Sequence, residues 1–272
     1  MKEYSEAQIQ KHQICIFTYH KVGSVLLSRV FREVSQEFGW QYRSLLGRQL
    51  KIPDEADVSL FSHSLIDLSQ IASAFVGVHL IRDPRDIVVS GYLYHLRTSE
   101  RWCTNTDFSS MSPILFPQVP YSQQHRSEEW KRNYLDSLSG RSYQENLLQR
   151  SQSDGLLFEM RNYASWTIES MRAWDFQRSN VLEVRFEDLM RHFDQTFFRI
   201  FEYLKFSPSQ TKVAMKIAVE HDLGRKTDAE IAALDHVTSA RTTRWDEYFD
   251  AAHHAEFRNL FPDVLQQLGY EE

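Results

Sequence analysis

Apolar residues follow two alternating patterns along this chain. Residues 13–18 (QICIFT) form a short apolar run rich in β-branched and aromatic side chains, which indicates a buried strand. After a turn, apolar residues recur at helical spacing from Leu26 to Phe38, and Gly39 ends the run. The start of the chain therefore predicts a strand, a loop and a helix in that order.

The same patterns recur further along the chain. Asp83 and Pro84 come shortly after the apolar run at 74–81. Aspartate favours a helix cap and proline a first helical position. Short apolar runs predict further strands at 40–46, 58–62, 74–81 and 180–185. Helical spacing predicts helices within 127–175 and at 186–204, 211–220 and 256–268.

Two segments lack a clear pattern. Residues 98–121 contain three prolines and many hydroxyl side chains, which favours a long surface loop, and 221–244 is polar and has no predicted element. Alternating strands and helices favour a parallel sheet flanked by helices. We predict a single α/β domain over 1–272, with a polar N-terminal extension at 1–12 and a substrate-covering region at 98–175.

Composition narrows the class of protein. The chain has 272 residues, a net charge of −6 and two cysteines, which disfavours a nucleic-acid binder, a disulfide framework and a four-cysteine zinc site. No apolar stretch approaches about 18 residues, and the first residues are polar, so neither a membrane span nor a secretory signal is expected. We expect a cytoplasmic protein with no metal, nucleic-acid or membrane partner.

The first loop, residues 18–25 (TYHKVGSV), has the chemistry of a phosphate site. Gly23 lets the backbone approach a ligand, and the amides of Gly23, Ser24 and Val25 lie at a predicted helix N-terminus, where the partial positive charge attracts anions. Lys21 adds a full charge. The loop differs from GxxxxGK[ST], because its lysine precedes the glycine. The alternative is a surface turn in which Lys21 is solvated.

A second loop follows the predicted strand at 74–81. Arg82 stands where that strand ends, and Ser90 comes eight residues later in the next helix. A guanidinium and a hydroxyl so placed can share one phosphate. The alternative is that Arg82 and Arg85 form surface ion pairs with Asp83 and Asp86, which suits Arg85 better than Arg82.

Three segments together resemble a known family. TYHKVGS (18–24), LIRDPRDIVVSGY (80–92) and VRFEDL (184–189) are similar to motifs of the PAPS-dependent sulfotransferases, of the cytosolic and bacterial small-molecule type. They occur in family order, and the resemblance spans about 13 to 262. It implies a fold related to the P-loop kinases. It also implies transfer of a sulfuryl group from PAPS (3′-phosphoadenosine 5′-phosphosulfate) to an acceptor, leaving PAP, without a metal.

The resemblance assigns roles to individual residues. Lys21 is similar to the lysine that contacts the bridging oxygen of the leaving phosphate, and Phe186 stands where the family often has a tyrosine near the adenine. The other implied cofactor contacts are Val22, Gly23, Ser24 and Val25 for the 5′-phosphate, Arg82 and Ser90 for the 3′-phosphate, and Arg241 or Arg244 in the C-terminal loop. That loop departs from the family pattern, because its glycines are missing.

The resemblance also indicates a catalytic base. His63, nineteen residues before Arg82, stands where many members have a catalytic histidine, and we expect it to take the proton of the acceptor. The alternative is a solvated loop histidine. His20 replaces a proline of the family and is a second candidate, more suited to a structural or substrate-facing role. Trp102, Phe158 and Tyr163 are expected to line the acceptor pocket.

Of the predicted reaction, the acceptor is the component that the sequence determines least. An alcohol or amine on a small molecule, such as a natural product, is the first expectation, and a glycan is the alternative. Asp154, Glu159 and Glu169 could favour a cationic acceptor, but a solvated helix face is the expected reading of these acids. Two rival functions stay open: a non-catalytic PAP-binding module and a phosphoryl-transfer enzyme on the related kinase fold. The oligomeric state is also open.

Overall fold

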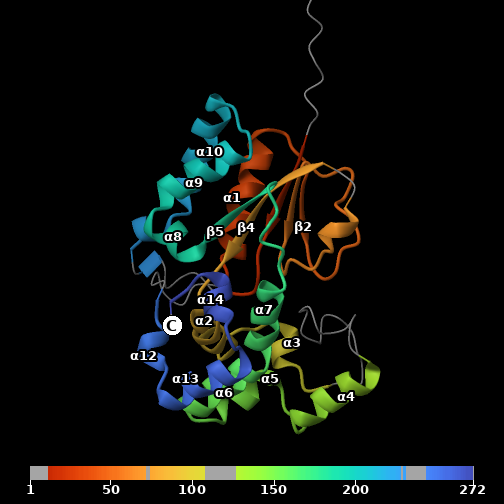
Figure 1. Cartoon of the computed structure of the whole chain (residues 1–272), viewed down its shortest axis with the longest axis vertical. Coiled ribbons are helices and arrows are strands. Elements are labelled where there is room, and N and C mark those ends of the chain that lie inside the picture. The colour runs from red at the N-terminus through yellow and green to blue at the C-terminus, as the bar shows by residue number, and fades with distance from the viewer. Residues whose placement is uncertain (1–11, 72–73, 108–126, 228, 231–242, 272) are drawn as a thin grey trace, which may run out of the picture.

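The computed structural model of the chain is built around a five-stranded parallel sheet (Figure 1). It describes residues 12–71, 74–107, 127–227, 229–230 and 243–271. In spatial order the strands are β2 (Tyr42–Leu45), β3 (Val58–Phe61), β1 (Gln13–Phe17), β4 (Phe75–Ile81) and β5 (Val181–Arg185). Every neighbouring pair is parallel. The prediction of an α/β fold with a parallel sheet flanked by helices is therefore confirmed.

The central strand is β1, and it sets the position of the candidate site. Phe17, its last residue, aligns with Phe61 of β3 on one side and with His79 of β4 on the other. The last four residues of β1 are buried, as its uniformly apolar sequence predicts for a central parallel strand. Because parallel strands end at one edge, the loops that follow Phe17, Phe61 and Ile81 come together there.

Different segments cover the two faces of the sheet. Ile16 belongs to a hydrophobic cluster that includes residues of three helices packed in a layer. Phe17 points to the opposite face and packs in a second cluster with Ile52, Leu68 and Trp174, which come from connecting segments and a 3-10 helix. The helices of the first layer are α1 (Ser24–Glu37), α9 (Phe193–Tyr203) and α10 (Pro208–Glu220), and the 3-10 helix is η1 (Leu68–Gln70).

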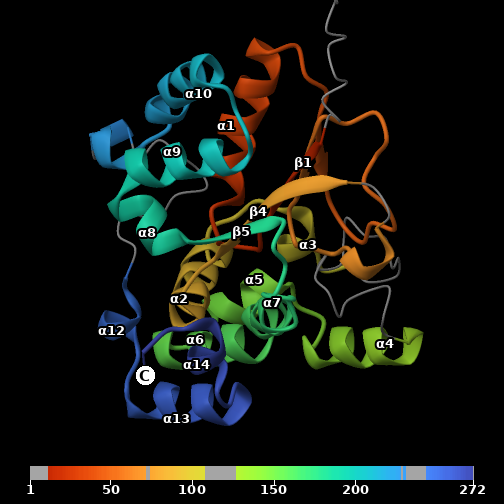
Figure 2. The same ribbon diagram turned by 45° about the horizontal axis from the view of Figure 1, so that its top comes forward.

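The other helices lie mostly beyond one edge of the sheet, where α2, α6, α7 and α13 pack on one another (Figure 2). In the described part of the chain no helix is long and apolar enough to cross a membrane. The helices outside the first layer are α2 (Pro84–His95), α3 (Arg101–Thr104), α4 (Glu128–Ser137), α5 (Tyr143–Leu148), α6 (Gln152–Arg161), α7 (Tyr163–Arg172), α8 (Phe186–Arg191), η2 (Leu223–Arg225), α12 (Trp245–Tyr248), α13 (Ala251–Leu260) and α14 (Val264–Leu268).

Several predicted helices are broken into two. The run at 186–204 is interrupted at His192, which has φ −125° and ψ 50°, and the run at 256–268 is interrupted before Asp263, which has φ 60°. A similar break at Asn162 separates α6 from α7. Apolar spacing does not reveal these breaks, because both halves keep their apolar side chains on the core. The start of α2 is as predicted: Asp83 caps it and Pro84 is its first residue.

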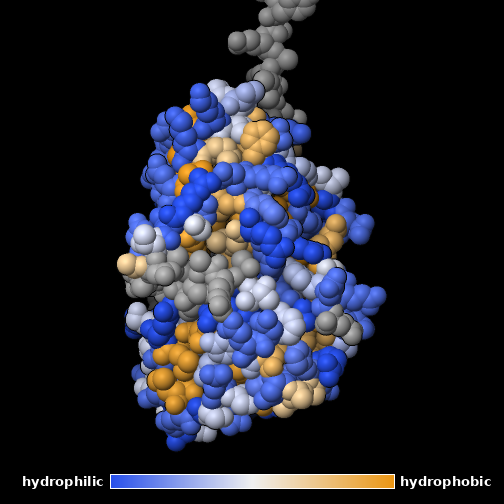
Figure 3. Space-filling model, turned by 90° about the vertical axis from the view of Figure 1, so that its left-hand side faces the viewer, coloured by the Kyte–Doolittle hydropathy of each residue, from blue (hydrophilic) through white to orange (hydrophobic). Residues whose placement is uncertain are grey.

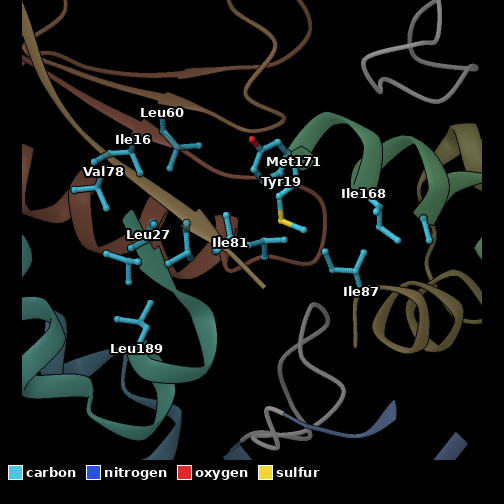
Figure 4. Packing of buried hydrophobic residues seen from close by; sticks show 14 of the residues in the cluster. Ile16, Tyr19, Leu27, Leu60, Val78, Ile81, Ile87, Ile168, Met171 and Leu189 are labelled. Carbon is cyan, nitrogen blue, oxygen red and sulfur yellow. The ribbon is translucent and has the colours of Figure 1, made fainter. Parts of the chain in front are cut away.

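One hydrophobic cluster runs from the sheet into the outer helices. Figure 4 shows Ile16 and Val78 near Leu27 of α1, while Ile87 and Ile168 continue the packing toward α2 and α7. The loops at the edge of the sheet are therefore held between two packed layers. On one side of the molecule the surface is mostly hydrophilic, with hydrophobic residues gathered in its lower part (Figure 3).

Candidate functional site

The loop between β1 and α1 has a conformation that requires glycine. Gly23 has φ 80°, and a Cβ atom there would lie 2.9 Å from the Leu80 side chain and 3.2 Å from Phe186. Lys21 has φ 61°, an uncommon conformation for a residue with a side chain. Helix α1 starts at Ser24 with no side-chain cap and no acidic residue in its first turn. Its N-terminus therefore keeps the partial positive charge that favours an anion.

Ser24 holds the loop together. Its hydroxyl donates to the Tyr19 carbonyl at 2.9 Å and accepts from the Thr18 hydroxyl at 2.9 Å. The proton of the Ser24 hydroxyl is thus directed into the loop itself. Val22 is fully buried, and Val25 is exposed at the start of α1.

Lys21 is enclosed. Its Nζ lies 3.9 Å from the centre of the Tyr94 ring. Burial lowers the pKa of Lys21 to about 7; the positive charges of Arg82 and Arg97 act in the same direction, while Glu100 and Glu159 oppose them. A solvated lysine would keep a pKa near 10.4. The surroundings therefore disfavour the charged form of Lys21, and an anionic ligand next to it would favour that form again.

Arg82 and Arg85 have different surroundings. Arg85 pairs with Asp83 as expected, with Nε 3.0 Å from Asp83 Oδ1 and Nη2 2.8 Å from Oδ2, but the pair is buried and does not lie on the surface as predicted. Arg82 is buried, and its Nη1 donates to the Lys21 carbonyl at 2.9 Å. Its guanidinium lies 4.7 Å from the centre of the Phe186 ring. The hydrogen bond from the Arg82 side chain to the Lys21 carbonyl thus joins the two candidate phosphate-binding loops.

The third motif, residues 184–189, also contacts the loop that follows β4. The Glu187 carboxylate accepts from the Asp83 amide at 2.9 Å and from the Tyr270 hydroxyl at 2.9 Å. Phe186 lies beside both Gly23 and Arg82. The three segments singled out in the sequence therefore meet at one place.

Ser90 and the C-terminal arginines are less closely joined to Arg82. Ser90 lies within α2 and is 8% exposed, and its hydroxyl has no hydrogen bond within the described residues. Asp86 accepts from the backbone amides of Arg244 and Trp245 at 2.8 and 3.1 Å, and burial raises the pKa of Asp86 to about 6. The Arg244 side chain donates to Tyr248. Arg241 lies outside the described residues.

Histidine rings form a row beside Lys21. The His20 ring is stacked on His95 at 5.0 Å between centroids with an interplanar angle of 9°, and on His63 at 6.4 Å and 22°. Tyr163 lies 4.6 Å from His20. The three histidines come from the loops after β1 and β3 and from the end of α2. The sequence had singled out His20 and His63, but His95 carried no separate signal.

The rings of His20 and His63 are in the neutral form near pH 7. Burial lowers the pKa of His63 to about 4. The pKa of His20 lies well below its usual value, chiefly because of burial, and further because positive charge on His95, Lys21 or His63 would repel a charged His20 ring. Within the described residues the buried Nε2 atom of His20 has no hydrogen-bond partner. A neutral imidazole with an open nitrogen can accept a proton.

Two of the three expected pocket residues lie near this row. Trp102 is stacked on Tyr163 at 4.6 Å, and its Nε1 donates to Glu100 at 2.6 Å. The Tyr94 hydroxyl donates to the other oxygen of Glu100 at 2.8 Å. Phe158 instead packs on Tyr143 and Arg150.

Glu159 corrects a prediction. It is fully buried, although a solvated helix face was expected. Its Oε2 lies 2.8 Å from His95 Nδ1 and 2.8 Å from the Tyr143 hydroxyl. A Cβ at Gly91 would lie 2.5 Å from Oε1, so the glycine makes room for the carboxylate. The described residues contain no group of three or more His, Cys, Asp or Glu able to hold a metal ion.

No family model matches the chain, and no curated protein matches it. Among solved structures, the chain is similar to a mouse sulfotransferase complexed with PAP, with 13% sequence identity and a TM-score of 0.46. The match covers 94% of this chain and 85% of the mouse protein.

Proposed function

We propose that this protein transfers a sulfuryl group from PAPS to a hydroxyl or amine of a small-molecule acceptor and releases PAP. The observation that carries the proposal is the position of two cationic side chains, the buried Arg82 and the half-buried Lys21, at the carboxyl edge of the sheet. The Arg82 guanidinium donates to the backbone carbonyl of Lys21 at 2.9 Å, and burial lowers the pKa of both side chains. Two such cations beside a helix N-terminus suit a ligand with two phosphate groups.

In this proposal the two loops hold different ends of the nucleotide. Lys21 and the first amides of α1 stabilise the negative charge that develops on the leaving 5′-phosphate. Arg82 offers parallel donors to the 3′-phosphate, with Ser90 further along α2. The Phe186 ring, which borders Gly23 and Arg82, supplies an apolar surface for the adenine.

The acceptor proton goes to a histidine. His63 is the first candidate, and its neutral ring can take the proton as the acceptor oxygen or nitrogen forms its bond to sulfur. The bond between sulfur and the bridging oxygen breaks in the same step, and its electrons remain on the phosphate. His20, next to Lys21 in the chain, is the second candidate. Trp102 and Tyr163, near His20, line the acceptor side in this proposal.

Ligand-dependent thermal stability tests the donor site without knowledge of the acceptor. We expect PAP at about 100 times its Kd to stabilise the protein by about 2.7 kcal/mol, a shift of several degrees in Tm. Arg82→Ala should abolish the shift because it removes the buried cation. The control is Arg225→Ala, which removes an exposed arginine paired with Asp194, and it should keep the shift.

The other nucleotides separate the rival functions. ADP, and ATP with magnesium, should give clearly smaller shifts than PAP, because neither has a 3′-phosphate for Arg82. A larger shift with ATP and magnesium would support phosphoryl transfer instead. The absence of any PAP shift in the wild-type protein would contradict the proposal.

A further inference from the structure

A chain of hydrogen-bonded side chains, buried at Tyr19 and His79 and half-buried at Glu183 and Trp174, leads from β5 through β4 to the first candidate phosphate loop. His79 of β4 is fully buried, and its Nδ1 lies 2.5 Å from Glu183 Oε2 of β5. Its Nε2 lies 2.8 Å from the Tyr19 hydroxyl, in the loop after β1. The other Glu183 oxygen accepts from Trp174 Nε1 at 2.9 Å. The His79 ring is also stacked on Trp174 at 4.0 Å.

The chemistry of these partners sets the direction of the hydrogen bonds. A carboxylate only accepts, so Nδ1 of His79 carries a proton and donates to Glu183. Burial lowers the pKa of His79, so the ring is neutral and Nε2 has a lone pair. The Tyr19 hydroxyl therefore donates to Nε2.

Tyr19 connects this chain to the loop. Its carbonyl accepts from the Val22 amide at 3.1 Å and from the Ser24 hydroxyl at 2.9 Å. Tyr19 is thus held at both its side chain and its backbone. The loop that follows contains Lys21 in the left-handed region, an unfavourable conformation for a residue with a side chain, which persists only where surrounding contacts hold it.

We propose that Trp174, Glu183, His79 and Tyr19, which we call the loop anchor, position residues 20–25 for phosphate binding. Stability alone does not explain the loop anchor, because buried polar groups usually contribute less than apolar side chains of similar volume. The neighbouring residues of β4, Val78 and Leu80, are apolar and face the other side of the sheet. The inference rests on the proposed function, since PAP is the ligand whose affinity the loop anchor would set.

Tyr19→Phe tests the loop anchor with the loss of one oxygen atom. We expect PAP to bind on the order of tenfold more weakly in isothermal titration calorimetry, because one lost hydrogen bond lets the loop leave its binding conformation. The matched control is Tyr143→Phe. It removes an equally buried hydroxyl, which donates to Glu159, a carboxylate that is also bonded to a histidine, His95. Its PAP affinity should stay within about twofold of the wild type.

Amide hydrogen exchange gives a readout that needs no ligand. In Tyr19→Phe, exchange in residues 20–25 should become faster relative to exchange in α9, whereas Tyr143→Phe should leave this ratio unchanged. Equal loop exchange in Tyr19→Phe and the wild type would overturn the inference. If the wild type fails to bind PAP, the proposed function fails, and the exchange comparison still decides whether the loop anchor exists.

A double-mutant cycle separates positioning from stability. The Tyr19 hydroxyl acts through His79, so His79→Gln combined with Tyr19→Phe should weaken PAP binding no more than the larger of the two single changes. Additive effects on PAP affinity would overturn the inference. If His79→Gln does not fold, the two Tyr19→Phe measurements decide the question alone.

Discussion

At the scale of single residues, Lys21 is the most informative side chain. It is the one cation in the loop after β1, and burial together with Arg82 lowers its pKa to about 7. At pH 8 most molecules without ligand therefore carry a neutral Lys21. A bound phosphate favours the charged form and raises the pKa again. Binding and protonation of this residue are thus coupled.

This coupling predicts proton uptake. At pH 8, PAP binding should take up close to one proton, because the phosphates are already ionised and Lys21 is not. Titration calorimetry in buffers with different ionisation enthalpies measures the number. Lys21→Arg is the control, since arginine stays charged and should bind PAP without uptake. Equal uptake in the two proteins would contradict the assignment.

At the scale of elements, the pair α2 and α6 shows how one small residue sets the position of a charge. Gly91 faces Glu159, and Glu159 in turn bonds to His95 and Tyr143. The Glu159 carboxylate can be buried against α2 because Gly91 has no side chain at the point of contact. Glu159 in turn holds His95 by a hydrogen bond, and the His95 ring is stacked on His20.

Gly91→Ala should therefore destabilise the protein. Helix propensity alone would favour alanine by up to about 1 kcal/mol. The new Cβ would lie 2.5 Å from Glu159 Oε1, and displacing a buried carboxylate should cost on the order of 2 kcal/mol. Urea unfolding monitored by circular dichroism gives the free energy of unfolding. A variant as stable as the wild type would show that α2 and α6 adjust without cost.

At the scale of the whole molecule, buried histidines dominate the pH response. The pKa values of His20, His63 and His79 are lowered, chiefly by burial, whereas burial raises the pKa of Asp86 to about 6. The unfolded chain protonates its histidines near pH 6.5. Below that pH the unfolded state binds more protons through these three groups, and Asp86 acts in the opposite direction between about pH 6 and 4.

The free energy of unfolding should consequently fall as the pH is lowered from 7 to 5. His20, His63 and His79, together with His254, whose pKa is also lowered, act against one carboxyl group, so the loss exceeds the gain. Urea midpoints at a series of pH values measure it. His63→Asn should show a smaller loss over the same range, because one titrating group is removed. A midpoint that is constant or rises toward pH 5 would contradict neutral buried histidines.

The strands, the parallel sheet and the two candidate phosphate-binding loops could all be predicted from the amino-acid sequence. These features are local: a buried strand is recognised by its own apolar run, and the loop after β1 by the residues it contains. The ion pair of Arg85 with Asp83 was also predictable, because the partners are two residues apart. The breaks at His192 and before Asp263 were not, since apolar spacing continues through them.

Which side chains meet at the site depends on how distant segments pack in the folded chain. His95 and Glu159 are 64 residues apart and are joined by the packing of α2 on α6, and Tyr19 and His79 are 60 apart and are joined by the alignment of β1 with β4. Nothing in the local pattern distinguishes a buried glutamate from a solvated one. Burial and pairing depend on contacts between distant segments, and those contacts exist only in the folded chain.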